Sequence, residues 1–385
     1  MNYSFYDKIK VSELSGRYIC LEHIEPLIEK LPKLFKVEIS GYSVENRPIY
    51  HIEWGRGETK ILAWSQMHGN ESTTTKAVFD LLNYLATDDK MVQMWHEKIT
   101  LHLIPMLNPD GAESYTRENA ADIDLNRDFL DLSQPESLLL MNIFNEIDPD
   151  FCFNLHDQRT IFGVGKTGKP ATISFLAPAF NEACEINETR QKAVNIIVAM
   201  NDALQKHIPG QVGRFDDTFN RNCAGDTFQS MGVPTILFEA GHYPGDYERE
   251  DTRKLIFISL ISALKEISEN DVVDNKTALY LNIPQNNQCF FDFVYRNVNI
   301  DCENSEIITS FAAQYKEVLV NKKIWFEAYI SCIGELKDYF GHIEYDAKNQ
   351  KFQQEDNHFP IIDNKANFFI GKNNKYVNGL IKFQQ

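Results

Sequence analysis

The chain has 385 residues, 43% of them hydrophobic, 12% aromatic and 24% charged, which is enough apolar material for a folded protein of about two domains. Its formal net charge of −17 excludes an extended nucleic-acid-binding surface, because such surfaces neutralise phosphates with Lys and Arg. No apolar run is long enough to cross a membrane or to act as a secretory leader, and the seven scattered cysteines include no Cys-x-x-Cys pair, so we expect a cytoplasmic protein with free thiols and no membrane partner.

Short β-like runs alternate with longer helical runs from about residue 20 to residue 268. The expected strands lie at residues 36–40, 49–54, 60–66, 99–105, 151–156 and 234–239. The expected helices lie at residues 22–30, 73–85, 135–147, 188–206 and 252–268, and apolar residues recur at helical spacing in the fourth of them. Such alternation is typical of an α/β fold in which helices cover the faces of an open sheet.

The pattern changes after residue 268. A polar stretch at residues 269–277 is followed by short alternating runs, such as 278–283 and 290–295, with Asn, Gly, Pro and Asp between them. We therefore predict a first domain over residues 1–270 and a smaller β-rich C-terminal domain over residues 275–385. Nothing in the second segment indicates its role or a protein partner.

A short polar segment follows the third expected strand, where a helix is about to begin. It contains His68 and Glu71 three residues apart, and an imidazole and a carboxylate at this spacing can ligate one Zn²⁺ from a turn. A His-x-x-Glu tetrapeptide also arises by chance, and a zinc site needs a third protein ligand and a position for water. Taken alone, the motif leaves a metal site and an ordinary surface turn as alternatives.

Further polar groups lie beside other expected strands and helices. They are Asn108-Pro109-Asp110-Gly111, Arg117, Asp124-Leu125-Asn126-Arg127, His156 and Glu239. Because ligand sites in open α/β sheets lie at the carboxyl ends of strands, we expect these groups to converge on one site. The alternatives are a packed strand-end histidine, a structural ion pair for Glu239, and surface ion pairs for the two arginines.

The order of these motifs resembles that of the zinc carboxypeptidase family, the carboxypeptidase A-like metallopeptidases. The segment Gly41-Tyr42-Ser43-Val44-Glu45-Asn46-Arg47-Pro48-Ile49 resembles the lead-in to the first metal motif of that family. The likeness covers roughly residues 20–245 and implies a mixed open sheet with helices on both faces. It implies nothing for the C-terminal domain.

The resemblance implies one zinc ion per chain, held by His68, Glu71 and His156, with the fourth position left for water. Asp124 would orient the ring of His68, and Glu239 would be the general base that takes a proton from that water. The implied activity is hydrolysis of a C-terminal peptide bond, so the expected partner is a peptide or amino-acid amide substrate.

The resemblance also implies how the substrate is held. Arg117 corresponds to the cation beside the tetrahedral oxyanion, and Asn126 and Arg127 to the pair that binds the terminal carboxylate of the substrate. The chain departs from the family in one respect, because residues 157–238 contain no Tyr where the family has a substrate-contacting Tyr. Asp216, Asp217 and Asp226 lie before Glu239, and they are either turn and cap residues or acceptors for a basic substrate side chain.

Two other functions compete with the peptidase. An N-acyl amino acid deacylase of the aspartoacylase or succinylglutamate desuccinylase type would use the same metal site, but Asn108-Pro109-Asp110-Gly111 and the lead-in segment favour the peptidase. A binding module that has lost its activity would have no physical need for a buried Glu239 beside a metal. His102, which lies within an apolar run, is predicted to be packed and not to ligate.

Overall fold

The computed structural model describes residues 5–269, 274–302, 305–355 and 357–382. The chain divides into two compact units, of which the first comprises Met1–Gln158 and Ala171–Asn286 and the second Arg159–Pro170 and Asn287–Gln385. This division differs from the boundary expected at residues 270–275, because it follows Asn286 and assigns an internal segment to the second unit. No described helix has the length and apolar character needed to cross a membrane.

The first unit is built on an eight-stranded sheet. Its strand order is β1-β2-β4-β3-β5-β9-β7-β8, with the bounds Phe35–Tyr42, Pro48–Gly55, Ile99–Ile104, Thr59–Ser65, Phe151–Asp157, Thr235–Ala240, Ile173–Leu176 and Val212–Arg214. The central strands β4, β3, β5 and β9 run parallel, whereas β1, β2 and β7 join by antiparallel pairing. The predicted mixed α/β sheet is confirmed.

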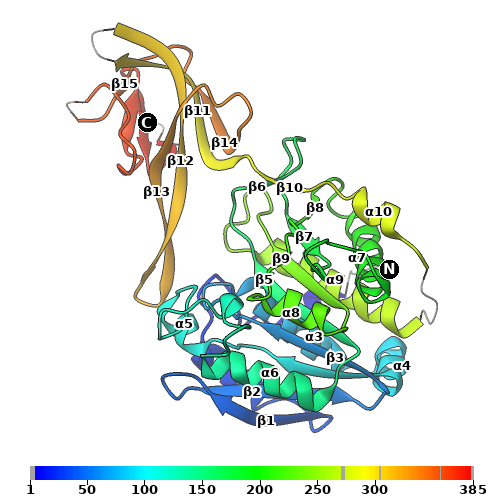
Figure 1. Ribbon diagram of the computed structural model, residues 1–385. Coiled ribbons are helices and arrows are strands. Elements are labelled where there is room, and N and C mark those ends of the chain that lie inside the picture. The colour runs from blue at the N-terminus through cyan, green and yellow to red at the C-terminus, as the bar shows by residue number, and fades with distance from the viewer. Residues whose placement is uncertain (1–4, 270–273, 303–304, 356, 383–385) are drawn as a thin grey trace. The chain divides into compact units, whose positions relative to one another are not determined.

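Helices cover both faces of this sheet. Figure 1 shows α6 (Pro135–Ile147) and α8 (Ala224–Ser230) in front of it. Behind it, α3 (Thr73–Leu85), α7 (Glu188–Leu204) and α9 (Glu250–Glu269) pack against one another. The shorter helices are α1 (Tyr6–Ile9), α2 (Leu21–Ile28), α4 (Lys90–Lys98), α5 (Pro109–Ser114), α10 (Thr277–Leu281) and the 3-10 turn η1 (Leu125–Arg127).

The core in front of the sheet joins β3 to α6 and α8. Phe228 of α8 stacks on Phe144 of α6 with ring centroids 4.1 Å apart, and Trp64 of β3 meets Phe228 edge-on at 5.5 Å. All three side chains are buried. Since aromatic burial supplies a large part of core stability, this cluster fixes the strand that leads into the His68 segment.

Behind the sheet, a buried ion pair ties α3 to α9 and to the N-terminal segment. Both side chains of Asp80 and Arg253 are fully buried, and the guanidinium binds the two carboxylate oxygens at 2.6 and 2.7 Å. Arg253 also donates to the carbonyl oxygens of Val11 and Leu14, and the hydroxyl of Tyr6 donates to Asp80. The polar atoms of the pair are thus well satisfied, as burial of two charges requires.

The second unit is β-rich, as predicted. One four-stranded sheet has the order β13-β12-β11-β14, with bounds Lys323–Gly334, Ser305–Val320, Phe290–Cys302 and Phe340–Asp346. The other is formed by β15 (Phe352–Gln353), β16 (Phe368–Ile370), β17 (Asn374–Val377) and β18 (Leu380–Lys382), while β6 (Phe162–Val164) pairs with β10 (Asn286–Gln288). An aromatic core that includes Tyr295, Phe311 and Phe368 joins the two larger sheets. The alternating run at 278–283 is not a strand, because most of it forms α10, which buries Tyr280 and exposes Leu279 and Leu281.

The Asp80–Arg253 pair makes the first unit sensitive to one substitution. Asp80→Ala leaves a buried guanidinium without its partner, so we expect a loss of about 3–5 kcal/mol in the free energy of unfolding. The measurement is urea unfolding followed by the fluorescence of the buried Trp54, Trp64 and Trp95. Glu269→Ala, which removes an exposed pair with Lys265, is the control and should cost less than about 1 kcal/mol. Equal losses in both variants would contradict the role given to the buried pair.

Candidate metal centre

The predicted site residues come together at one end of the central strands. His68 follows the end of β3, His156 is the last residue but one of β5, and Glu239 is the last residue but one of β9. His156 and Glu239 are direct partners in the parallel register of β5 and β9. Glu71 stands in the turn between His68 and α3. The convergence expected at the carboxyl ends of the strands is therefore present.

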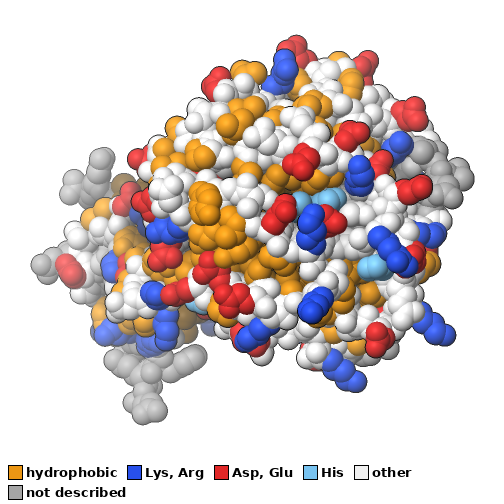
Figure 2. All heavy atoms as spheres, turned by 90° about the horizontal axis from the view of Figure 1, so that it is seen from below, with side chains coloured by type: hydrophobic (Ala, Val, Ile, Leu, Met, Phe, Trp, Pro, Cys, Tyr) orange, Lys and Arg blue, Asp and Glu red, His pale blue; other side chains and the backbone are white. Residues whose placement is uncertain are grey.

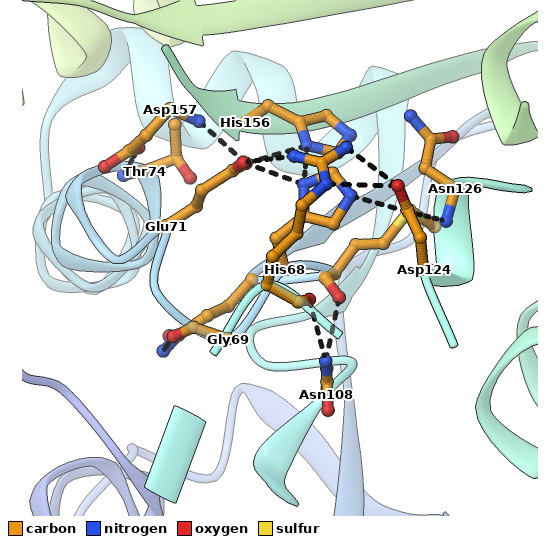
Figure 3. A network of polar contacts seen from close by, with 12 residues as sticks. His68, Gly69, Glu71, Thr74, Asn108, Asp124, Asn126, His156 and Asp157 are labelled. Atoms are coloured by element: carbon orange, nitrogen blue, oxygen red, sulfur yellow. Dashed lines mark hydrogen bonds and ion pairs between the residues drawn. The ribbon is translucent and has the colours of Figure 1, made fainter. Parts of the chain in front are cut away.

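Two glycines allow the turn that carries His68. A Cβ on Gly69 would lie 1.9 Å from the backbone carbon of Gly111, so the two segments can touch only because residue 69 has no side chain. Asn108 holds them together, because its Nδ2 donates to the carbonyl of Met67 at 3.2 Å while its Oδ1 caps α5 by accepting from Gly111 N at 2.9 Å. Figure 3 shows Asn108 below the His68 turn in this role.

The lead-in segment, residues 41–49, is connected to the Asn108–Gly111 motif through Asp110. Asp110 accepts hydrogen bonds from Ser43 Oγ at 2.7 Å and from the backbone N–H of Glu45 at 3.0 Å, and it pairs with Arg47 at 2.6 Å. The Asp110 carboxylate is buried, so these partners compensate its desolvation. Two motifs that are far apart in the sequence thus form one scaffold under the His68 turn.

Three potential metal ligands form a tight buried cluster. His68 Nδ1 lies 2.8 Å from Glu71 Oε1, His156 Nδ1 lies 2.9 Å from Glu71 Oε2, and the two Nδ1 atoms are 3.1 Å apart. Figure 3 shows the three side chains pointing toward one another. They form one of the two groups among the described residues whose geometry suits a metal ion. The other group consists of Cys20, Glu22 and His23.

Asp124 decides which nitrogen of His68 is available. Its Oδ1 lies 3.0 Å from His68 Nε2, so the Nε2–H of a neutral ring donates to the carboxylate and Nδ1 presents a lone pair. That lone pair faces a carboxylate oxygen and a second imidazole nitrogen. A cation such as Zn²⁺ satisfies all three acceptors, and two His with one Glu is an established zinc ligand set. The donor set therefore fits the metal.

Electrostatics in the cluster favour an ionised Glu71. Burial on its own raises the pKa of the carboxyl group, but His68 and His156 beside it hold that pKa well below its usual range. Burial lowers the pKa of His156, which keeps its ring neutral, as a metal ligand must be. Asp157 supports the arrangement: its backbone N–H donates to Glu71 Oε2 at 3.1 Å and its carboxylate accepts from Thr73 N and Thr74 N at the start of α3.

Glu239 is the buried carboxylate without a structural partner. Among the described residues its Oε2 has no hydrogen-bond partner. Burial, and then the negative charges of Glu71 and Asp157, raise the pKa of Glu239 well above its ordinary value. Such an unpaired group beside a ligand cluster is costly for folding and is characteristic of a proton-transferring residue. The structural ion pair considered for this residue is not seen.

Arg117 lies at the rim of the cluster. Its Nε donates to Asp124 Oδ2 at 3.0 Å, and its Nη1 donates to Glu71 Oε1 at 3.3 Å. The side chain is 40% exposed, so the guanidinium faces both the ligands and the outside. This geometry places one fixed positive charge within reach of a substrate at the ligand cluster, and not in a remote surface ion pair.

Asn126 and Arg127 lie next to Asp124 and link the site to α8. Asn126 Oδ1 accepts from the backbone N–H of Ala224 at 3.0 Å, so one polar atom of this side chain is already used. Arg127 Nη1 donates to the carbonyl oxygen of Asn126 at 2.7 Å and to Cys223 Sγ at 3.1 Å. The remaining guanidinium nitrogens of Arg127 are on an exposed side chain and are oriented by these two contacts.

The three aspartates before Glu239 have different surroundings. Asp217 pairs with Arg190 at 2.6 Å and Asp216 accepts from the backbone N–H of Thr218, so both have structural partners. Asp226 is buried in the first turn of α8, and burial raises its pKa to about 6. His102 is packed as predicted, with its Nδ1 3.1 Å from His51 Nε2.

Arg249 is a supporting residue that sequence reasoning missed. Its buried guanidinium donates to the carbonyl oxygens of Ala240, Gly241 and Gln158, the residues that directly follow the site positions of β9 and β5. A single Arg with positive φ before α9 gives little signal in a sequence, because its acceptors are backbone atoms of distant segments. Asp157, which follows His156 directly, was also missed, because Ser72 before α3 is itself a favoured capping residue and the sequence gives no sign that the helix start takes its acceptor from Asp157.

Comparison with known proteins identifies the first part of this fold. Residues 20–156 match the model of a family described as zinc carboxypeptidase, a range that includes His68, Glu71, Asp124 and His156 but not Glu239. Carboxypeptidase SOL1 of Arabidopsis thaliana is 29% identical over 158 residues, which are 35% of this chain and 32% of that protein. Probable carboxypeptidase 2 of Arthroderma benhamiae is 30% identical over 162 residues, 41% of this chain and 28% of the relative. The chain thus spans about a third of the length of these relatives.

Solved structures share the fold at low sequence identity. A metallo-carboxypeptidase from Pseudomonas aeruginosa has a TM-score of 0.53 at 19% identity, over 65% of this chain and 69% of that one. Carboxypeptidase A from Helicoverpa armigera has a TM-score of 0.52 at 16% identity, over 70% of this chain and 81% of that one. Residues 20–156 thus match the zinc carboxypeptidase family, and the first unit shares its fold with solved carboxypeptidases.

Proposed function

We propose that this chain is a zinc-dependent exopeptidase that removes a residue from the C-terminus of a peptide. The observation that carries the proposal is the buried cluster of His68, Glu71 and His156 beside the unpaired carboxylate of Glu239. One metal ion per chain is held by the three ligands, with Asp124 fixing the tautomer of His68. Bound zinc lowers the pKa of a water molecule and polarises a carbonyl oxygen.

Glu239 moves the proton in this proposal. A raised pKa brings a carboxylate closer to the working pH, which makes it both an effective acceptor of a proton from water and an effective donor to the leaving amine. Its place opposite His156 in the strand register puts it on the wall of the ligand cluster. Arg249 holds the ends of the two strands that carry these side chains.

The two arginines bind different parts of the substrate. Arg117, held by Asp124 and Glu71, stabilises the negative charge that develops on the carbonyl oxygen under attack. Arg127, with Asn126, binds the free C-terminal carboxylate, a task suited to a planar guanidinium fork. Asp226, a buried carboxylate in the first turn of α8, is the proposed acceptor for a basic side chain on the residue removed.

The competing functions receive less support. The family match and the similar proteins are carboxypeptidases, which does not favour an N-acyl amino acid deacylase. Retention of the ligand cluster and of an unpaired Glu239 speaks against a binding module without activity. A cytoplasmic location is part of the proposal and is supported by seven cysteines that are all free in the structure.

The metal assignment predicts zinc content. The purified protein should contain about one zinc per chain, and His68→Ala or His156→Ala should lose it, because each removes one of three protein ligands. Metal analysis after gel filtration measures this. His96→Ala, which changes a half-exposed imidazole on α4, is the matched control and should keep the metal. Stoichiometric zinc in both ligand variants would refute the assignment.

The role of Glu239 predicts a loss of rate without a loss of structure. Glu239→Gln keeps the size of the side chain and removes the proton acceptor, so kcat should fall by about 10²–10⁴-fold. Zinc content and the urea midpoint should stay at or above those of the parent, because the substitution removes an unpaired buried carboxylate. If kcat falls by less than about tenfold, which corresponds to about 1.4 kcal/mol in the barrier, another group is the base.

Arg127 distinguishes an exopeptidase from an endopeptidase. In Arg127→Ala, kcat/KM for a peptide with a free C-terminus should fall by a factor that corresponds to a loss of about 2–3 kcal/mol in transition-state stabilisation. This is the scale of a lost charge-assisted hydrogen bond. The amidated analogue of that peptide should be cleaved poorly by both enzymes and change little. Arg117→Ala should slow both substrates, and Arg56→Ala, which removes an exposed pair with Glu97, should slow neither. Equal cleavage of free and amidated peptides by the parent enzyme would contradict the exopeptidase assignment. Only zinc-dependent amide hydrolysis would then remain as the proposed activity.

A further inference from the structure

Strand β1 leaves the edge of the large sheet open. It is the last strand in the sheet order, and no strand of the described residues pairs with its outer side. Figure 1 shows it at the lower margin of the first unit. An open edge presents a row of backbone N–H and C=O groups that can pair with another strand. This edge has no part in the proposed peptidase function.

The side chains along β1 divide into two rows. Successive residues of a strand point to opposite faces, so Val37 and Ile39 share one face while Lys36 and Glu38 share the other. Val37 is 37% exposed and Ile39 is 48% exposed. Figure 2, which views the molecule from below, shows hydrophobic side chains lying among charged groups of both signs on this face.

The two charged residues have partners within the chain but remain accessible. Lys36 Nζ lies 3.3 Å from Glu53, with 66% of the Lys36 side chain exposed. Glu38 Oε1 lies 3.2 Å from His51 Nδ1, with 50% of the Glu38 side chain exposed. Each charge can therefore contact a further group on a strand added at the edge.

The charge order on β1 is complementary to itself. Isolated charges on an edge strand usually prevent pairing. In an antiparallel pair of two β1 strands centred on Val37, however, Lys36 of each copy lies opposite Glu38 of the other, and Phe35 lies opposite Ile39. A register centred on Glu38 would place two carboxylates face to face, and one centred on Lys36 would place two ammonium groups face to face. Among these three registers, only the one centred on Val37 places opposite charges against each other.

We propose that the outer edge of β1 is a self-association site, at which a second copy of this chain pairs antiparallel about Val37. The resulting two-fold dimer has one sheet that continues across the interface, and it repeats both Lys36–Glu38 contacts by symmetry. The exposed apolar row of Val37 and Ile39 is covered in the dimer. The proposed partner is the same protein, because an identical strand in this register supplies the complementary order of charges.

The test is analytical ultracentrifugation of the full chain over a concentration series. The parent protein should dimerise, and Lys36→Glu and Glu38→Lys should each raise the dissociation constant by about tenfold or more, because each places like charges opposite each other twice. An equimolar mixture of these two variants should dimerise again, since every cross-strand pair is then of opposite sign. The double variant Lys36→Glu/Glu38→Lys should dimerise like the parent.

Two further variants separate strand pairing from general charge effects. Val37→Pro should weaken the dimer, because it inserts a ring and removes a donor at the centre of the register. Lys265→Glu on α9 reverses an exposed charge far along the chain and should leave the dissociation constant unchanged. Far-ultraviolet circular dichroism establishes that each variant is folded. A parent protein that stays monomeric at every concentration would overturn the proposal, as would a dimer that is insensitive to both single charge reversals.

Discussion

The site depends on forcing three electron-pair donors into contact. His68 Nδ1, His156 Nδ1 and the carboxylate of Glu71 lie 2.8 to 3.1 Å from one another, closer than lone pairs remain without a cation or shared protons between them. The surrounding scaffold supplies the constraint. Gly69 against Gly111 sets the turn, Asn108 joins the two segments, and Asp124 turns the ring of His68 so that its lone pair points inward. Metal affinity here is therefore a property of the fold around the ligands as much as of the ligands.

The same constraint explains the unusual charge balance around the cluster. Glu71, Asp124, Asp157 and Glu239 bring four carboxyl groups together, whereas Arg117 and Arg249 are the cations whose fields act on Glu239. A bound divalent cation offsets much of this negative charge. Asp157 is satisfied by the N-terminal N–H groups of α3, so the helix contributes positive charge without a further basic side chain. Burial raises the pKa of Asp157 as well, but among these four carboxyl groups only Glu239 has a pKa raised well above its ordinary value.

The sequence predicted the long elements and the site better than the short elements and the second unit. The six expected strands were found, β3, β5 and β9 among them because short apolar runs bounded by polar residues mark strands that are buried on both faces, and the candidate site residues lie at or just beyond the ends of these three. Helices α4, α5 and α8 were missed, since each is shorter than three turns, although Asp89 and Asn108 are recognisable caps. The alternating run at 278–283 does not form a strand, because residues 278–281 belong to α10, and a run this short with one buried Tyr280 cannot distinguish a helical turn from a strand. The assignment of Arg159–Pro170 to the second unit depends on pairing between β6 and β10, which no local pattern encodes.

In the proposed exopeptidase, which has no Tyr between residues 157 and 238, substrate binding would fall to η1 and the start of α8. Asn126 gives its Oδ1 to the start of α8, so only its amide N–H groups are left for a substrate carboxylate. Arg127 is oriented from the same place, by the carbonyl oxygen of Asn126 and by Cys223, the residue before α8. A movement of α8 would therefore displace both groups together. Phe228 anchors this helix in the core against Trp64 and Phe144. The positions of Asn126 and Arg127 therefore depend on the same packing that fixes β3 and the His68 turn.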